Sequence, residues 1–127
     1  MKEIRFSLVV PLYNEEAVIE ENYRRLTEIL RGLGEPYEII YVNDGSRDRT
    51  GMLARSLCRQ DPDVKLITLS RNFGHQTAIT AGMDYASGDA VIIIDADLQD
   101  PPEIIPQLIE RWKEGYDVVY GRRAFRE

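Results

Sequence analysis

Three aspartates follow one of the most apolar short runs in the chain. Residues 91–103 read VIIIDADLQDPPE, so Asp95, Asp97 and Asp100 come behind four hydrophobic side chains. Carboxylates about 3–4 Å apart repel one another unless a cation or a proton lies between them. In extended backbone Asp95 and Asp97 point to the same side, and Gln99 continues that row. The pattern therefore predicts three oxygen ligands on one face, which suits Mg²⁺ or Mn²⁺.

The same segment has a purely structural interpretation. Asp95 and Asp97 can be solvated turn residues, with Asp100 serving only as a helix cap. In DPPE, Asp100 fits the N-cap, Pro101 the first helical position and Glu103 the capping-box position, so this stretch predicts a helix start. The prolines therefore need no functional explanation, whereas two aspartates behind a buried strand favour the metal site.

Asp44 is a second candidate. It follows the apolar stretch IIYV and Asn43, and it precedes Gly45 and Ser46. Its carboxylate could accept hydrogen bonds from a base or a ribose at the end of a strand. The tetrapeptide NDGS is also an ordinary turn, so both interpretations stand.

Two further segments carry candidate ligand contacts. In RNFGHQ, Gly74 would allow close backbone approach at the start of a helix, whose N-terminus favours anions. His75 either contacts a phosphate there or lies on the surface. Tyr13 either flanks a base or packs beside Pro11.

These candidates need elements that bring them together. Short β-branched runs alternate with longer stretches of helical spacing, which predicts an α/β fold with a mostly parallel sheet and helices on both faces. The expected strands lie in FSLVVP, YEIIYVN, VKLITLS, AVIIID and YDVVYG. Ligands of such sheets bind beyond the carboxyl ends of the strands. The segments PLYNEE, NDGSRD, SRNFGHQ and DADLQD lie there.

The first expected helix spans roughly residues 15–33. Its apolar side chains share one stripe, while Arg24, Arg25 and Glu28 take the outer face. Gly32 and Gly34 are expected to end this helix, and Gly88 and Gly115 to end the third and fourth helices. The stripe consists of Ile19, Tyr23, Leu26, Ile29, Leu30 and Leu33.

Composition limits the class of protein. With 127 residues, 43% of them hydrophobic, the chain is expected to be one domain with a real core. Sixteen Lys and Arg against 22 Asp and Glu give a net charge of -6, which argues against nucleic acid as a partner. The lone Cys58 excludes an intrachain disulfide and fits a reducing compartment as a small buried side chain. No apolar run approaches about 18 residues, so the chain is expected to be soluble.

Common phosphate-binding motifs are missing. No G-x-G-x-x-G follows the first strand, and GSRDRTGM has glycines but lacks the lysine of a P-loop. A single cysteine and a single histidine argue against a structural zinc site. A divalent cation held by carboxylates is the remaining way to neutralise bound phosphates.

Taken together, four segments resemble the family-2 nucleotide-sugar glycosyltransferases, in the branch similar to dolichol-phosphate mannose synthase and bacterial polyprenyl-phosphate glycosyltransferases. The matching segments are VVPLYNEE, YVNDGSRDRT, RNFGHQTAITAGMDYASGD and DADLQDPPE, spread over nearly the whole chain. The resemblance implies a GT-A-type nucleotide-binding fold, a divalent cation, and a UDP- or GDP-sugar as donor. It implies an inverting transfer of the sugar to a polyprenyl phosphate, dolichyl or undecaprenyl, at the inner, cytoplasmic face of a membrane.

The resemblance also implies roles for individual residues. Asp95 and Asp97 become the catalytic candidates, and with Gln99 they would hold the metal on the donor diphosphate. Arg123 in YGRR would lie near phosphate groups of the donor or acceptor. The nucleotide would contact Pro11, Tyr13, Glu15, Asp44, Gly74, Gln76, Asp95 and Ala96.

The chain is shorter than the catalytic domains of this family. Catalytic domains of this family usually continue well past this point, whereas here the chain stops at Glu127, soon after the fifth expected strand. Residues 1–127 are therefore expected to be the N-terminal, donor-binding portion, without the acceptor-binding segments. Such a fragment is expected to self-associate through its uncovered surface.

Two other functions remain open. One is a non-catalytic module that binds a nucleotide or a nucleotide sugar. The other is phosphoryl transfer through an aspartyl-phosphate, which also uses paired aspartates and Mg²⁺. That chemistry normally places its aspartates at the first strand, and the first strand here ends in PLYN.

Overall fold

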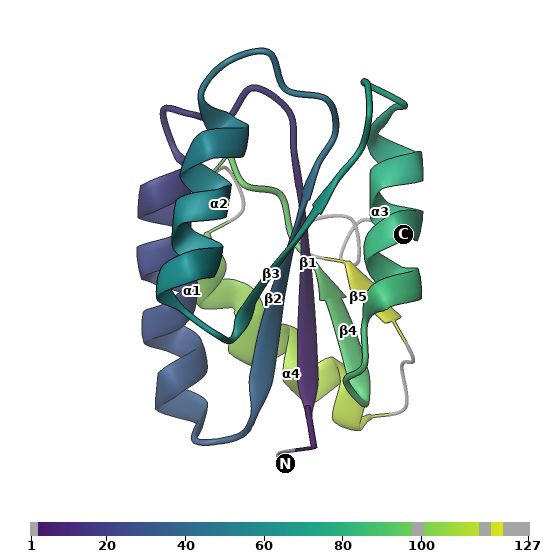
Figure 1. Cartoon of the computed structure of the whole chain (residues 1–127). Helices are drawn as coiled ribbons and strands as arrows, with labels where there is room; N and C mark the ends of the chain where they lie inside the picture. The colour runs from purple at the N-terminus through teal and green to yellow at the C-terminus, as the bar shows by residue number, and fades with distance from the viewer. Residues whose placement is uncertain (1–2, 98–100, 115–117, 121–127) are drawn as a thin grey trace.

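A five-stranded parallel sheet forms the centre of the molecule. The computed structural model describes residues 3–97, 101–114 and 118–120, the last range by its backbone only. The strand order is β3-β2-β1-β4-β5, and all four strand pairs are parallel (Figure 1). The predicted parallel sheet is therefore confirmed. The strands are β1 (Phe6–Leu12), β2 (Tyr37–Asn43), β3 (Val64–Thr68), β4 (Ala90–Ile93) and β5 (Val118–Tyr120).

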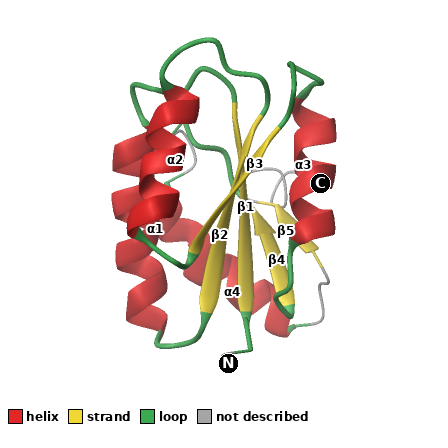
Figure 2. Cartoon of the chain, in the orientation of Figure 1, coloured by secondary structure: helices red, strands yellow, loops and turns green. Residues whose placement is uncertain are grey.

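Helices cover both faces of this sheet, as the alternation of patterns predicts (Figure 2). On one face lie α1 (Ile19–Leu33), α2 (Thr50–Gln60) and α4 (Ile105–Lys113), the last preceded by a 3-10 turn, η1 (Pro102–Ile104). The opposite face is covered by α3 (His75–Tyr85). None of the helices in the described part of the chain combines the length and the apolar character needed to cross a membrane.

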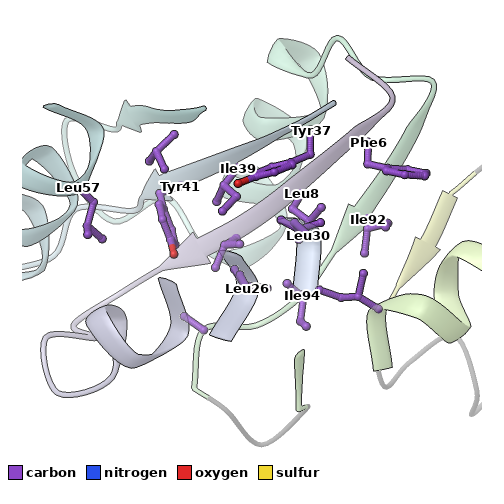
Figure 3. Packing of buried hydrophobic residues seen from close by; sticks show 14 of the residues in the cluster. Phe6, Leu8, Leu26, Leu30, Tyr37, Ile39, Tyr41, Leu57, Ile92 and Ile94 are labelled. Carbon is purple, nitrogen blue, oxygen red and sulfur yellow. The ribbon is translucent and has the colours of Figure 1, made fainter. Parts of the chain in front are cut away.

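The central strand β1 is buried on both faces because its side chains alternate between two apolar clusters. Phe6 and Leu8 pack into the larger cluster under α1, α2 and α4, as Figure 3 shows. Val9 points the other way and packs with Ile79 of α3. Cys58 packs against the larger cluster but is only partly buried, whereas the sequence predicts a buried small side chain.

The first helix confirms the predicted apolar stripe but begins later than expected. Ile19, Leu26 and Leu30 are buried, while residues 16–18 form a turn in front of the helix. This turn is closed by the carbonyl of Glu15, which accepts hydrogen bonds from the backbone N–H groups of residues 18 and 19. Gly34 ends α1 in the left-handed conformation, whereas Gly32 lies within the helix.

The prediction that Pro101 occupies the first helical position is wrong. Pro101 is extended, with ψ 134°, and Pro102 begins η1. The reason is that a residue directly before a proline is disfavoured in helical conformation. Glu103 of η1 forms an ion pair with Arg25 of α1, while Asp100 lies outside the described residues.

Gly88 does not end α3, which stops at Tyr85, and Gly115 lies outside the described residues. The N–H of Gly88 instead donates a 2.8 Å hydrogen bond to Oγ of Ser7, and a Cβ at this glycine would lie only 2.7 Å from that oxygen. The close approach of these two segments explains the glycine better than a helix end does.

Helix α3 packs directly on the sheet at Gly82. A Cβ at this position would lie 2.4 Å from Cγ1 of Val9 and 3.1 Å from Cγ2 of Val42. Distances below 3.0 Å are too short for carbon atoms that are not bonded, so any larger residue would force either the helix or the Val9 side chain to shift. The contact therefore sets how closely α3 approaches β1 and β2.

Candidate functional site

A cavity of about 530 Å³ opens at the carboxyl ends of the strands. It lies where the strand order reverses, because the chain passes from β3 on one side of β1 to β4 on the other. Such a switch point is the usual ligand site of an open α/β sheet. The cavity is lined by Pro11, Leu12, Tyr13, Glu15, Asp44, Asn72, Gly74, His75, Asp95, Ala96 and Asp97.

Most of the site residues predicted from the sequence line this one cavity. Gln76 does not, although it follows His75 in the first turn of α3. Gln99 and Arg123 lie outside the described residues, so their predicted metal and phosphate contacts stay predictions. The cavity includes Pro11, Tyr13, Glu15, Asp44, Gly74, Asp95, Ala96 and Asp97.

Asp95 and Asp97 reach the cavity from a turn rather than from an extended strand. Beyond β4, the N–H of Ile94 still pairs with the carbonyl of Val9 at 3.1 Å, and residues 96 and 97 then turn. Ala96 is buried between the two acids, while Asp95 is partly exposed and Asp97 exposed. The expected extended row is thus wrong at this point, yet both carboxylates line the same cavity.

Acidic groups make this end of the sheet electronegative. Burial raises the pKa of the Glu15 carboxyl above its ordinary 4.5, and the charges of Asp97 and Asp95 raise it further. Across the described ranges, no group of three His, Cys, Asp or Glu side chains is placed to hold a metal ion by itself. A cation that bridged a ligand's phosphates to Asp95 and Asp97 would still relieve this repulsion, since Mg²⁺ typically binds one or two carboxylates together with substrate phosphates.

The Asp44 carboxylate is held by the loop between β3 and α3. Oδ1 accepts the N–H of Phe73 at 2.8 Å, and Oδ2 accepts the N–H of Gly74 at 3.1 Å. The side-chain Nδ2 of Asn72 adds a third bond to Oδ2, at 3.1 Å. Asp44 is only 3% exposed. The carboxylate thus lies just before the N-terminus of α3, where negative charge is favoured, while the anion of a ligand predicted there stays a prediction.

The backbones of two neighbouring loops touch at Gly45. Its φ of +69° is in the left-handed region, and a Cβ built on it would lie 2.3 Å from the carbonyl carbon of Arg71 and from the nitrogen of Asn72. Only glycine fits both constraints. At Gly74, by contrast, a Cβ would have no protein atom within 4 Å, and its φ of +105° favours glycine. The predicted close approach of a ligand to this backbone stays a prediction.

The loops after β1 and β2 are joined by hydrogen bonds. Asn14 donates its N–H to Oγ of Ser46 at 3.0 Å, and its Oδ1 accepts the N–H of Arg47 at 2.9 Å. The N–H of Glu15 donates to Oγ1 of Thr50 at 2.7 Å. Asn14 adopts a φ of 54°, which is uncommon for a residue other than glycine. These bonds hold the wall of the cavity that carries Glu15 and Tyr13.

His75 and Tyr13 complete the accessible lining. The His75 side chain is 49% exposed, and its Nε2 lies 3.7 Å from Oδ1 of Asp95. Tyr13 is 44% exposed. Both side chains line the cavity and both are exposed, so the predicted contacts of His75 with a phosphate and of Tyr13 with a base stay predictions.

Asn72 and Leu12 also line the cavity, although no sequence pattern indicates a role for either residue. Asn72 lies in the quoted segment SRNFGHQ. Its importance comes from Asp44, 28 positions away, so no local pattern indicates it.

Comparisons with known proteins agree with this geometry. The sequence profile described as glycosyl transferase family 2 matches residues 7–127. An uncharacterized glycosyltransferase, YkcC from Bacillus subtilis (strain 168), is 58% identical over 126 residues, which cover 99% of this chain and 39% of the relative. The undecaprenyl-phosphate 4-deoxy-4-formamido-L-arabinose transferase of Pseudomonas aeruginosa (strain LESB58) is 48% identical over 122 residues, which cover 95% of this chain and 36% of the relative.

A solved structure shares the arrangement of elements. The mannosyltransferase PcManGT from Pyrobaculum calidifontis, in complex with GDP-Man and Mn²⁺, matches 73% of this chain with a TM-score of 0.64 and 30% sequence identity. The match covers 27% of that protein. The chain thus spans well under half the length of each of these similar proteins.

Proposed function

The chain belongs to glycosyl transferase family 2 and has the GT-A-type fold, and we propose that it is the donor-binding part of an inverting glycosyltransferase. The donor is a nucleotide diphosphate sugar and the acceptor a polyprenyl phosphate. One observation carries this proposal: the cavity at the switch point gathers the loops after β1, β2, β3 and β4 around Asp95 and Asp97.

The acidic lining supports a donor that arrives with a divalent cation. A diphosphate would be repelled by Glu15, Asp95 and Asp97 unless positive charge lay between them. Mg²⁺ or Mn²⁺ on the two aspartates would supply charge neutralisation for the diphosphate leaving group. The similar mannosyltransferase, whose structure contains GDP-Man and Mn²⁺, supports this choice of donor and ion.

The remaining lining residues suit a nucleoside. Tyr13 is exposed in the lining and offers an aromatic ring to a base, and Pro11, buried in β1, lines the same cavity. We assign Glu15, Asp44, Gly74 and Ala96 to the walls of the nucleoside pocket. The base, uracil or guanine, would thus lie on the β1 and β2 side and the diphosphate on the β4 side.

The reaction needs few groups from this part of the protein. The bond between the anomeric carbon and the diphosphate oxygen breaks, and an oxygen of the acceptor phosphate forms the new bond to that carbon. This oxygen is already ionised near pH 7, so the step does not require a general base. Asp95 and Asp97 would contribute by holding the divalent cation, whose positive charge would offset the negative charge that develops on the leaving group.

The polyprenyl phosphate acceptor is supported by the name of the Pseudomonas relative. Transfer at the inner face of a membrane, and self-association of these 127 residues, remain predictions. The aspartyl-phosphate alternative gains no support from the comparisons. A non-catalytic binding module would bind the same nucleotide sugar but would not transfer the sugar.

A transfer assay on the complete gene product tests the proposal. The assay uses radiolabelled UDP- and GDP-sugars, undecaprenyl phosphate in vesicles, and Mn²⁺. We expect labelled lipid with the wild type and its loss in Asp95→Asn and Asp97→Asn. Nucleotide binding without any transfer would favour the binding module, and the absence of nucleotide binding would contradict both functions.

A further inference from the structure

We infer that Asn72 is a nucleoside-binding residue, oriented by Asp44 so that its Oδ1 accepts a hydrogen bond from an N–H or O–H group of the donor nucleoside. The inference rests on the proposed function, because it names a contact within the same cavity. It also gives Asp44 a positioning role in place of the direct nucleoside contact predicted from the sequence.

The orientation of the Asn72 amide follows from its partners. Its Nδ2 lies 3.1 Å from Oδ2 and 3.2 Å from the backbone carbonyl of Asp44. Both partners are acceptors only, so the nitrogen must face them. The flipped amide would bring Oδ1 against two oxygens and is excluded on electrostatic grounds.

The amide oxygen is consequently turned away from Asp44. Asn72 is an exposed residue of the cavity lining, and within the described residues its Oδ1 accepts no hydrogen bond. Asp44, by contrast, is buried and already accepts three bonds at its carboxylate, out of about four positions available to such a group. Asn72 therefore presents a more accessible acceptor than Asp44 does.

The backbone around Asn72 is fixed before any ligand arrives. Asp44 holds the N–H groups of Phe73 and Gly74, and the backbone nitrogen of Asn72 lies against Gly45. A prearranged acceptor costs little conformational entropy on binding and discriminates well against ligands that lack the matching donor. A nucleoside offers two sources of such a donor, the base N–H and the ribose hydroxyls.

The test combines one substitution with ligands that each lack one donor. Calorimetry would measure the affinity of wild type and Asn72→Ala for UDP and GDP in Mn²⁺. The same titrations would use 2′-deoxy, 3′-deoxy and N3-methyl analogues of UDP. We expect about tenfold weaker binding of UDP or GDP by Asn72→Ala, the cost of one unpaired hydrogen bond.

The analogues identify the group that Asn72 contacts. The analogue that lacks this group should bind wild type about tenfold more weakly than the parent nucleotide, yet should bind Asn72→Ala as well as the parent does. A deoxy analogue with this behaviour assigns the contact to the ribose, and the N-methyl analogue assigns it to the base.

Folding is monitored by the melting temperature. Two of the three bonds to the Asp44 carboxylate come from backbone N–H groups, so Asn72→Ala should keep the loop. Asn72→Ser, whose hydroxyl is too short to replace Oδ1, is a second variant and should show the same loss of affinity. Gln60→Ala, which removes an exposed amide at the end of α2, is the matched control and should bind as wild type does.

Unchanged affinity of both Asn72 variants for a nucleotide that wild type binds would overturn the inference alone. Additive losses with every analogue would overturn it as well. A wild-type chain that bound neither nucleotide would overturn the proposed function together with the inference.

Discussion

The backbone N–H of Phe73 donates a 2.8 Å hydrogen bond to Oδ1 of Asp44. This bond joins the end of β2 to the start of α3, two elements that are far apart in the sequence. All three groups of this loop that bond to the Asp44 carboxylate are donors. The carboxylate can therefore hold the loop only because both of its oxygens are acceptors.

Asp44→Asn tests this dependence. The side chain keeps its shape but turns one oxygen into an NH₂ group that faces donors, which should cost about 1–3 kcal/mol of unfolding free energy. We expect weaker nucleotide binding with nearly unchanged Mn²⁺ affinity, both measured by calorimetry. Loss of metal binding with intact nucleotide affinity would show that Asp44 belongs to the metal site instead.

Gly45→Ala should damage the cavity through the backbone. It adds a Cβ 2.3 Å from two atoms of the neighbouring loop and strains a φ of +69°. We expect a loss of about 2–4 kcal/mol in urea unfolding and weaker nucleotide binding. Gly34→Ala is the matched control, since it has a φ of +73° with no atom within 4 Å of its Cβ. It should lose only about 1 kcal/mol and leave binding unchanged. Equal effects of the two substitutions would contradict the contact between the loops.

Nucleotide should stabilise the fold only when a divalent cation is present, because the carboxylates alone repel a diphosphate. At about one hundred times its dissociation constant, UDP or GDP should add about 2.7 kcal/mol to the unfolding free energy in Mn²⁺. Thermal shift in Mn²⁺ and in excess EDTA provides the comparison. Equal stabilisation in EDTA would count against a metal bridge from Asp95 and Asp97.

Glu15→Gln should stabilise the metal-free protein at pH 7 but not at pH 4. Burial and neighbouring negative charge raise the pKa of Glu15 above 4.5, so the folded state binds a proton more tightly than the unfolded state does. The ionised carboxylate is thus destabilising above its folded pKa, and this penalty disappears as the pH falls to 4.5 and below. Urea unfolding in EDTA at the two pH values measures the effect, with Glu110→Gln on the exposed side of α4 as the baseline. A gain at pH 4 as large as that at pH 7 would contradict the proposed repulsion.

Local sequence patterns were sufficient to predict the sheet, the helices on both faces and most of the cavity lining. Alternating and helical periodicities report which side chains are buried, and the switch point then brings the loops together. The contacts within the loops could not be predicted in this way. The bonds of Asp44 to residues 72–74 and of Glu15 to Thr50 join segments 28 or more positions apart, and their partners are ordinary polar residues with no signature of their own. The late start of α1 likewise depends on how the carbonyl of Glu15 closes a turn.

The close contact of α3 with the sheet at Gly82 links the position of this helix to the shape of the cavity. An α-helix moves largely as a rigid body. If a larger residue at position 82 displaced α3 from Val9, His75 at the start of the helix would be displaced as well. Such a shift of α3 would change the separation of 3.7 Å between Nε2 of His75 and Oδ1 of Asp95, although Gly82 lies in a later turn of the helix than His75. A larger residue at position 82 is therefore expected to shift the cavity lining without replacing any residue that lines it.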